Sequence, residues 1–246
     1  MYIKSYVIEK QPVGSTKPYV LLAGEKLRVV VETPTIDAFK DFYAGGPYVI
    51  GVDGSGTSTG IFVFGLDSAG NKVPKYAFNL TRSANETFVE FRVCYKRFFE
   101  KMLKTCKVTR AYYEEPMISF YSAVPVLYSL RTVLEELLVE NKGKLAYNTV
   151  LYYVANGTWK SWVKIQSGRR FVDCTENDKE YARAYFMESV EIRLGNGEPA
   201  LAMDITDAWG LGSVSSAGFV GSKNAKHVVI YDSEIGKQLN DERAFY

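Results

Sequence analysis

Four acidic residues are spaced so that their carboxylates can act together. Asp53 ends the apolar run YVIGVD, Glu114 ends the run VTRAYYE, and Asp204 and Asp207 lie in LAMDITDAWG. Carboxylates gathered at one point repel one another unless cations neutralise them, and a ligand set made only of oxygen selects Mg²⁺ or Mn²⁺. Two such ions in one active site serve phosphodiester hydrolysis. The acids therefore predict a site with two Mg²⁺ or Mn²⁺ ions.

Each acid also has a structural interpretation that involves no chemistry. Asp53 can accept backbone N–H bonds in the Gly/Ser/Thr turn that follows it, and Glu114 with Glu115 can solvate a strand end. Asp204 and Asp207 can be ordinary solvated helix positions. An active site is favoured only because all four acids occur together, each at the place along the predicted strands and helices that would bring it to a common site.

The apolar pattern predicts alternating strands and helices. Runs of alternating or continuous apolar residues predict strands, and apolar residues at helical spacing predict amphipathic helices. The predicted strands cover residues 48–53, 61–66, 76–80, 108–114 and 149–154. The predicted helices cover residues 85–104, a leucine-rich segment from about 127 that ends near 141–143, 178–193, and 200–216 after a turn at 195–199.

This order predicts an α/β protein with a ribonuclease H-like mixed five-stranded sheet, in βββαβαβα order, flanked by helices. Its first and fourth strands are central neighbours, so Asp53 and Glu114 lie at one edge of the sheet. Asp204 and Asp207 are i,i+3 and lie on one helix face. We expect residues 48–218 to form this core, residues 1–47 an N-terminal β extension, and residues 219–246 a C-terminal strand or tail.

Composition narrows the class of protein. The 246 residues include three cysteines at wide spacing, which we interpret as reduced core residues. The single histidine, His227, removes most routes to a histidine-rich metal site, a Ser-His-Asp triad or a Cys-His pair. The sequence has no apolar run long enough to span a membrane and begins without a secretory signal, so we expect a cytoplasmic protein. The net charge of +2 argues neither for nor against binding to nucleic acid. The seven basic residues from Arg92 to Arg110 form either a binding surface or a solvated helix face.

Three motifs, in order, carry a resemblance to a known family. The chain resembles the RuvC-type Holliday-junction resolvases, particularly their divergent phage-borne branch. GVDGSGTSTG (51–60) looks like the family's first strand and turn, AYYEEP (111–116) like the strand that ends in its glutamate, and DITDAWGLG (204–212) like its closing helix. NGTWKSWVK (156–164) is similar to its lysine-containing segment.

The resemblance implies a hydrolase, an endodeoxyribonuclease that resolves four-way or branched DNA as a homodimer in the cytoplasm of a bacterium or a phage-infected cell. It implies that Asp53, Glu114, Asp204 and Asp207 are the catalytic metal ligands. Glu114 is preferred to Glu115 because the family's glutamate directly follows the apolar strand residues. The chain departs from the family at two places. It lacks the aromatic residue that follows the glutamate and wedges the junction, for which Phe120 or Tyr121 is the substitute. It also has IQSGRRFVDC where the family has a glycine-rich segment after the lysine.

Residues expected to contact DNA surround the four acids. The cations Lys160, Lys164, Arg169 and Arg170 follow one another closely enough to meet phosphates on one side of the site. Trp159 either stacks on an unpaired base and packs against the lysine stems, or lies in the core with Trp162. The other residues that we expect to bind DNA are Ser55, Thr59, Phe120 and Tyr121.

Two rival functions remain open. DGSGTST (53–59) also looks like the first phosphate loop of sugar or acetate kinases of the actin-like class, although the only later glycine candidate, GLGSVSS (210–216), directly follows Asp207. The second rival is a non-catalytic DNA-binding protein on the same fold.

Overall fold

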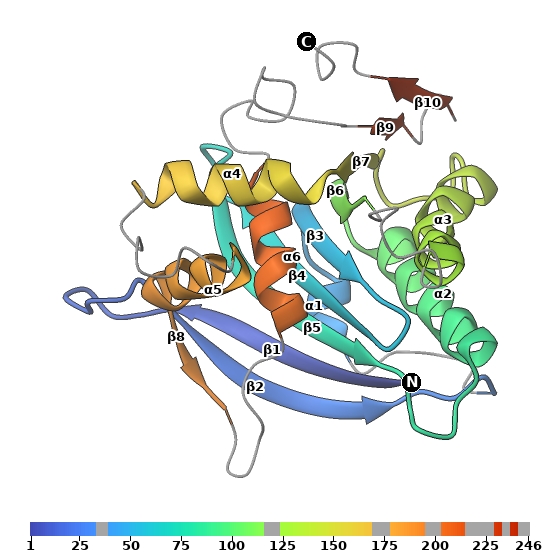
Figure 1. Cartoon of the computed structure of the whole chain (residues 1–246), viewed down its shortest axis with the longest axis horizontal. Helices are drawn as coiled ribbons and strands as arrows, with labels where there is room; N and C mark the ends of the chain where they lie inside the picture. Colours follow the sequence, from blue (N-terminus) through green and yellow to red (C-terminus); the bar gives the residue numbers. More distant parts are fainter. Residues whose placement is uncertain are drawn as a thin grey trace.

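The computed structural model of the chain describes residues 1–32, 39–115, 124–168, 178–194, 203–214, 229–232 and 237–240. Its elements (Figure 1) are, in chain order, β1 (Tyr2–Lys10), β2 (Tyr19–Arg28), α1 (Lys40–Tyr43), β3 (Tyr48–Gly54), β4 (Ser58–Leu66), β5 (Lys72–Thr81), α2 (Phe88–Thr105), β6 (Val108–Glu114), α3 (Val124–Glu140), β7 (Val150–Val154), α4 (Asn156–Gln166), α5 (Asp178–Ser189), β8 (Val190–Arg193), α6 (Met203–Ser213), β9 (Val229–Asp232) and β10 (Lys237–Asn240).

Five strands form the centre of the sheet in the order β7-β6-β3-β4-β5. Strands β3, β4 and β5 are an antiparallel meander, whereas β6 pairs parallel to β3 and β7 pairs parallel to β6. This is the strand order of the ribonuclease H fold. The predicted fold class, a mixed sheet of this type flanked by helices, is confirmed.

The sheet is wider than the five strands predicted. Within the described residues it has ten strands, because β1, β2 and β8 continue it beyond β5, and β9 and β10 continue it beyond β7. Within residues 1–47, Tyr2–Lys10 form β1 and Tyr19–Arg28 form β2, and the two strands pair antiparallel. The extension therefore belongs to the same sheet as the core.

The predicted helix over residues 178–193 is wrong in its last turn. Helix α5 ends at Ser189, and the next four residues form β8, which pairs parallel with β2. Val190 lies opposite Tyr19 and is only 2% exposed. Pairing with a strand about 170 residues earlier in the chain overrides the local helical pattern, which is the usual limit of propensity.

Helices cover both faces of the sheet, as Figure 1 shows. On one face, buried side chains of α1, α2 and α3 pack against Ile50, Val52 and their neighbours. On the other face, α4, α5 and α6 bury Trp159, Tyr181 and Ile205. Alternation along β3 therefore directs Gly51 and Asp53 toward the second face, where α6 lies.

The basic run on α2 is mostly engaged within the protein. Arg92 contacts Glu136 of α3 (Nη2 to Oε1, 2.5 Å), and Lys96 contacts Glu140 (Nζ to Oε1, 2.9 Å). Arg97 donates to the carbonyl oxygen of Val31. These contacts tie α2 to α3 and to the end of β2, so they favour the structural interpretation of this run over a binding surface.

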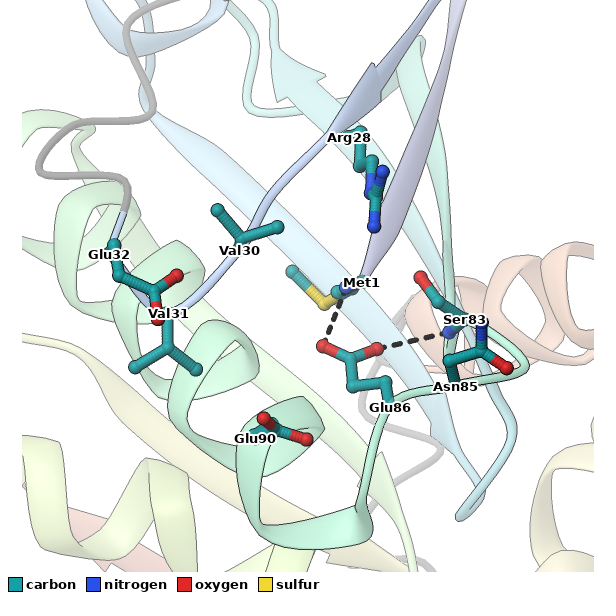
Figure 2. A pocket seen from close by; sticks show the side chains of 9 residues that line it. All are labelled: Met1, Arg28, Val30, Val31, Glu32, Ser83, Asn85, Glu86 and Glu90. Carbon is teal, nitrogen blue, oxygen red and sulfur yellow. Dashed lines mark hydrogen bonds and ion pairs between the residues drawn. The ribbon is translucent and has the colours of Figure 1, made fainter.

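The start of β1 is held by a buried ion pair beside a small cavity of about 150 Å³. The amino group of Met1 lies 2.6 Å from Oε1 of Glu86 and also donates to the carbonyl oxygen of Val29. Figure 2 shows Glu86 between this amino group and the backbone N–H of Ser83, which donates to Oε2. The contact connects β1 to the turn that precedes α2.

Cys94 and Cys106 are buried free thiols, as expected of reduced core residues, and Cys174 lies outside the described residues. No helix in the described part of the chain has the length and apolar character needed to cross a membrane.

Candidate active site

Asp53 and Glu114 lie at the same ends of two neighbouring parallel strands. The register pairs Val52 of β3 with Tyr113 of β6, and each acid is the next residue on its strand. Tyr112 packs with the core under α4 and α6, so alternation places Glu114 on the same face as Asp53. This is the arrangement that the sequence predicted for one edge of the sheet.

Helix α6 reaches these strands because glycine residues leave room for its backbone. A Cβ atom on Gly60, which pairs with Asp53, would lie 2.0 Å from the carbonyl oxygen of Asp204. A Cβ atom on Gly51 would lie 1.9 Å from the carbonyl oxygen of Ala208. Any other residue at these positions forces the helix away, so both glycines fix the position of the first turns of α6.

Three of the four predicted acids lie near enough to the fourth, Asp53, to change its pKa. Burial raises the pKa of Asp53 well above its usual range, and the negative charges of Glu114, Asp207 and Asp204 raise it further. The Glu114 carboxyl also hydrogen bonds to Asp53 and raises its pKa. Asp207 is only 1% exposed, while Asp204 stands partly exposed in the first turn of α6. Three elements thus direct four carboxylates together, at an electrostatic cost.

Two donors from α4 hold the Glu114 side chain. Asn156 donates from Nδ2 to Oε1 of Glu114 at 2.6 Å, and Trp159 donates from Nε1 to the same oxygen at 3.1 Å. Both lie in the first turns of α4, whose N-terminal end also favours a negative charge. Sequence reasoning missed Asn156, although its place at the start of a helix directly after β7 was a usable signal.

The assignment of Trp159 to base stacking is wrong in this structure. Its side chain is 0% exposed and packs in the core, and Trp162 is 7% exposed. The ring of Trp159 lies under α6, since a Cβ atom on Gly210 would meet it at 2.5 Å. The indole therefore positions a catalytic candidate and offers no face to a base.

The turn between β3 and β4 uses its hydroxyl groups internally. Ser55 Oγ donates to the carbonyl oxygen of Ser58 at 2.6 Å and accepts from the N–H of Ser58 at 3.1 Å. Thr59 is 0% exposed, so the prediction that it contacts DNA is wrong because it is buried between strands and helix. Gly56 brings the turn against Val126 of α3. The turn is thus supported from both sides.

Two of the predicted cations stand beside the acids. Lys160 and Lys164 lie one turn apart and half-buried on α4, and Nζ of Lys160 is 5.5 Å from the centre of the Trp159 ring. Trp159 donates to Glu114, so Lys160 lies next to a residue that contacts the candidate site, and Lys164 lies one helical turn farther along α4. Arg169, Arg170, Phe120 and Tyr121 lie outside the described residues.

The donor set fits hard divalent cations. It consists of carboxylate oxygens from Asp53, Glu114, Asp204 and Asp207, without nitrogen or sulfur, which is the chemistry that Mg²⁺ and Mn²⁺ prefer. Among the described side chains, no three acidic, histidine or cysteine groups stand in the close arrangement of a formed metal centre.

Comparisons with known proteins concern the fold. A scan of protein-family models and a search of curated protein sequences find no match. Among solved structures, the chain is similar to Thermus thermophilus RuvC in complex with a Holliday junction substrate, with 13% identity and a TM-score of 0.47 over 67% of this chain and 90% of that one. A second Thermus thermophilus RuvC structure has 15% identity and a TM-score of 0.44 over the same shares. The yeast mitochondrial Holliday junction resolvase Ydc2 has 13% identity and a TM-score of 0.40 over 71% of this chain and 82% of that one. The assignment of the fold rests on the strand order described above.

The raised pKa of Asp53 has a consequence for stability. The folded protein retains the Asp53 proton to a higher pH than the unfolded chain, so the metal-free protein loses stability as pH rises from about 4, the ordinary aspartate pKa, through the raised value. Asp53→Asn removes this loss. We expect the variant to be more stable than the wild type at pH 7 in chelator, since it carries no carboxyl that must ionise in this buried position.

Urea denaturation in chelator across this pH range measures the effect. Asp67→Asn is the control, because the turn amides of Asn71 and Ala69 lower the pKa of that exposed aspartate, which predicts a change of opposite sign. A wild type and an Asp53→Asn variant with parallel pH profiles contradict the clustering of the acids.

Proposed function

We propose that the chain is a divalent-metal-dependent endonuclease that cleaves branched DNA, with Asp53, Glu114, Asp204 and Asp207 as its metal ligands. One observation carries the proposal. Asp53 is buried at the end of β3, and burial together with the negative charges of Glu114 on β6 and of Asp207 and Asp204 on α6 raises its pKa. A fold tolerates such a cluster where a bound cation offsets the cost, and perturbed acids of this kind concentrate at active sites.

In this proposal the residues of the chain orient the site before the ions bind. Asn156 and Trp159 fix one oxygen of Glu114 and leave its second oxygen for a cation. Gly51 and Gly60 set the depth at which α6 presents Asp204 and Asp207. Two Mg²⁺ or Mn²⁺ ions, once bound, supply an activated water and stabilisation of the leaving oxygen of a phosphodiester.

The substrate follows from the motif resemblance and from the basic residues nearby. The three motifs in family order imply four-way or branched DNA as the substrate and a homodimer as the acting form. Lys160 and Lys164 lie on α4, the helix that holds the Glu114 side chain. We assign both lysines to phosphates of the DNA backbone.

The kinase alternative needs a second phosphate-binding domain. The strands of the described residues belong to one sheet with one ribonuclease H-like core, and a duplicated core is not among them. The segment from Gly210 to Ser213 is helical, and Gly210 and Gly212 pack against Trp159 and Phe64. Those glycines therefore serve helix packing, which favours the nuclease over the kinase. A non-catalytic DNA-binding protein has no need to preserve four converging acids.

Replacing one ligand by its amide tests the proposal. We expect Asp53→Asn, Glu114→Gln and Asp207→Asn each to lower the cleavage of a labelled four-way junction by at least about 1,000-fold in Mg²⁺ or Mn²⁺, because each loses a charge that holds the ions. DNA binding in chelator stays close to wild type. Glu115→Gln is the matched control, and a Glu115 effect with an active Glu114→Gln would reverse the choice between them. Cleavage by Asp53→Asn at the wild-type rate contradicts the site.

Asn156 offers a milder test of the same site. Asn156→Ala removes a donor that orients Glu114, and we expect a loss of about 10- to 100-fold in the cleavage rate with unchanged affinity for DNA. Gln166→Ala, which removes an exposed amide from the other end of α4, is the control. Equal rates for the two variants contradict a role for Asn156 in positioning Glu114.

The lysines are tested through salt dependence. Lys160→Gln with Lys164→Gln should weaken DNA binding in chelator equally for different sequences, and should reduce the slope of log K against log salt by about 1 to 2. Fluorescence anisotropy across a salt series measures the slope. An unchanged slope removes these lysines from the DNA-binding surface.

A further inference from the structure

A second site lies at the end of the sheet opposite the carboxylates. A cavity of about 710 Å³ opens there, within the size range of small-molecule pockets. Its floor is a row of paired strand residues, since Val150 of β7 lies opposite Arg110 of β6, and Arg110 lies opposite Val49 of β3. Lys72, at the start of β5, forms another wall. Asp53 and Glu114 lie at the other ends of β3 and β6, so this cavity is separate from the candidate active site.

The charges of this cavity are of one sign. Arg110 and Lys72 both line it, and none of its described lining residues is acidic. Burial, and then the positive charge of Arg110, lowers the pKa of Lys72 to about 7, and no acid contributes to that shift. Within the described residues, Arg110 makes no ion pair, whereas most of the basic residues on α2 do. Arg110 is thus a cation of the cavity that favours an anion.

The rest of the lining suits a nucleotide. The ring of Tyr147, 49% exposed, stands at the cavity as a surface for stacking. Asn71 and Thr109 also line the cavity, and their side chains donate to Asp67 and to the carbonyl oxygen of Tyr48. Lys72 also donates to the carbonyl oxygens of Gly212 and Ser213 at the end of α6, so the cavity borders the helix that carries Asp204 and Asp207.

We propose that this cavity binds a nucleotide phosphate, with Arg110 on the phosphate and Tyr147 against the base. The phosphate comes either from a free mononucleotide or from the backbone of bound DNA. This proposal does not depend on the proposed nuclease activity.

The test measures binding in chelator, where the carboxylate site takes no part. Deoxyadenosine monophosphate and inorganic phosphate are titrated by calorimetry, and labelled duplex DNA by fluorescence anisotropy. The variants are Arg110→Gln and Tyr147→Leu. Arg28→Gln is the matched control, because it removes the same charge from an exposed position on β2 that does not line this cavity. Circular dichroism checks the fold of each variant.

We expect Arg110→Gln to weaken mononucleotide binding at least about tenfold, the loss expected for a charge-assisted hydrogen bond, and Arg28→Gln to leave it unchanged. Tyr147→Leu should weaken the mononucleotide and not inorganic phosphate. A second outcome is that the mononucleotide does not bind, but Arg110→Gln and Tyr147→Leu each weaken DNA binding more than Arg28→Gln does. In that case the cavity binds a phosphate of the DNA backbone. If neither ligand distinguishes Arg110→Gln or Tyr147→Leu from Arg28→Gln, the proposal is wrong.

Discussion

The candidate active site depends on the close approach of helix α6 to strands β3 and β4. Glycine at positions 51 and 60 permits this approach, since a side chain at either position would overlap the helix backbone. The approach places the first turn of α6 over Gly60, the residue paired with Asp53. Without it, Asp204 and Asp207 would not reach the two acids at the strand ends. The packing of one helix thus determines whether four carboxylates meet.

The two ends of α6 lie in opposite electrostatic surroundings. Its N-terminal turn carries Asp204, and Lys72 donates to the carbonyl oxygens at its C-terminal end. Both placements match the helix macrodipole, which favours anions at the N-terminus and cations at the C-terminus. They offset part of the cost of gathering acids at one end. They also connect the carboxylate site with the cationic cavity through a single rigid element.

Much of the core fold and its acids was predictable from sequence, because both follow from local patterns. Period-two and helical spacing predicted the five central strands and most helices, and a strand-end position together with an i,i+3 pair predicted the four acids. Burial was less predictable. Thr59 and Trp159 look like surface residues of a DNA-binding motif, but both are buried, Trp159 against Gly210 of α6 and Thr59 on the other face of the sheet.

The remaining errors come from contacts between distant parts of the chain. Strand β8 exists because β2 offers it an edge, and no local pattern in residues 190–193 indicates that pairing. The hydrogen bond from Asn156 to Glu114 also joins segments about 40 residues apart. Such contacts need the strand order before they can be inferred.

The central claim is that the four carboxylates form one divalent-cation site, and counting bound Mn²⁺ tests it most directly. Electron paramagnetic resonance of free Mn²⁺ in a titration gives the number and affinity of bound ions for the wild type and for Asp53→Asn. We predict two ions per chain for the wild type, and at least about tenfold weaker binding for the variant, as expected when a charged ligand is lost. Equal Mn²⁺ binding by both proteins, or none by either, would contradict the account.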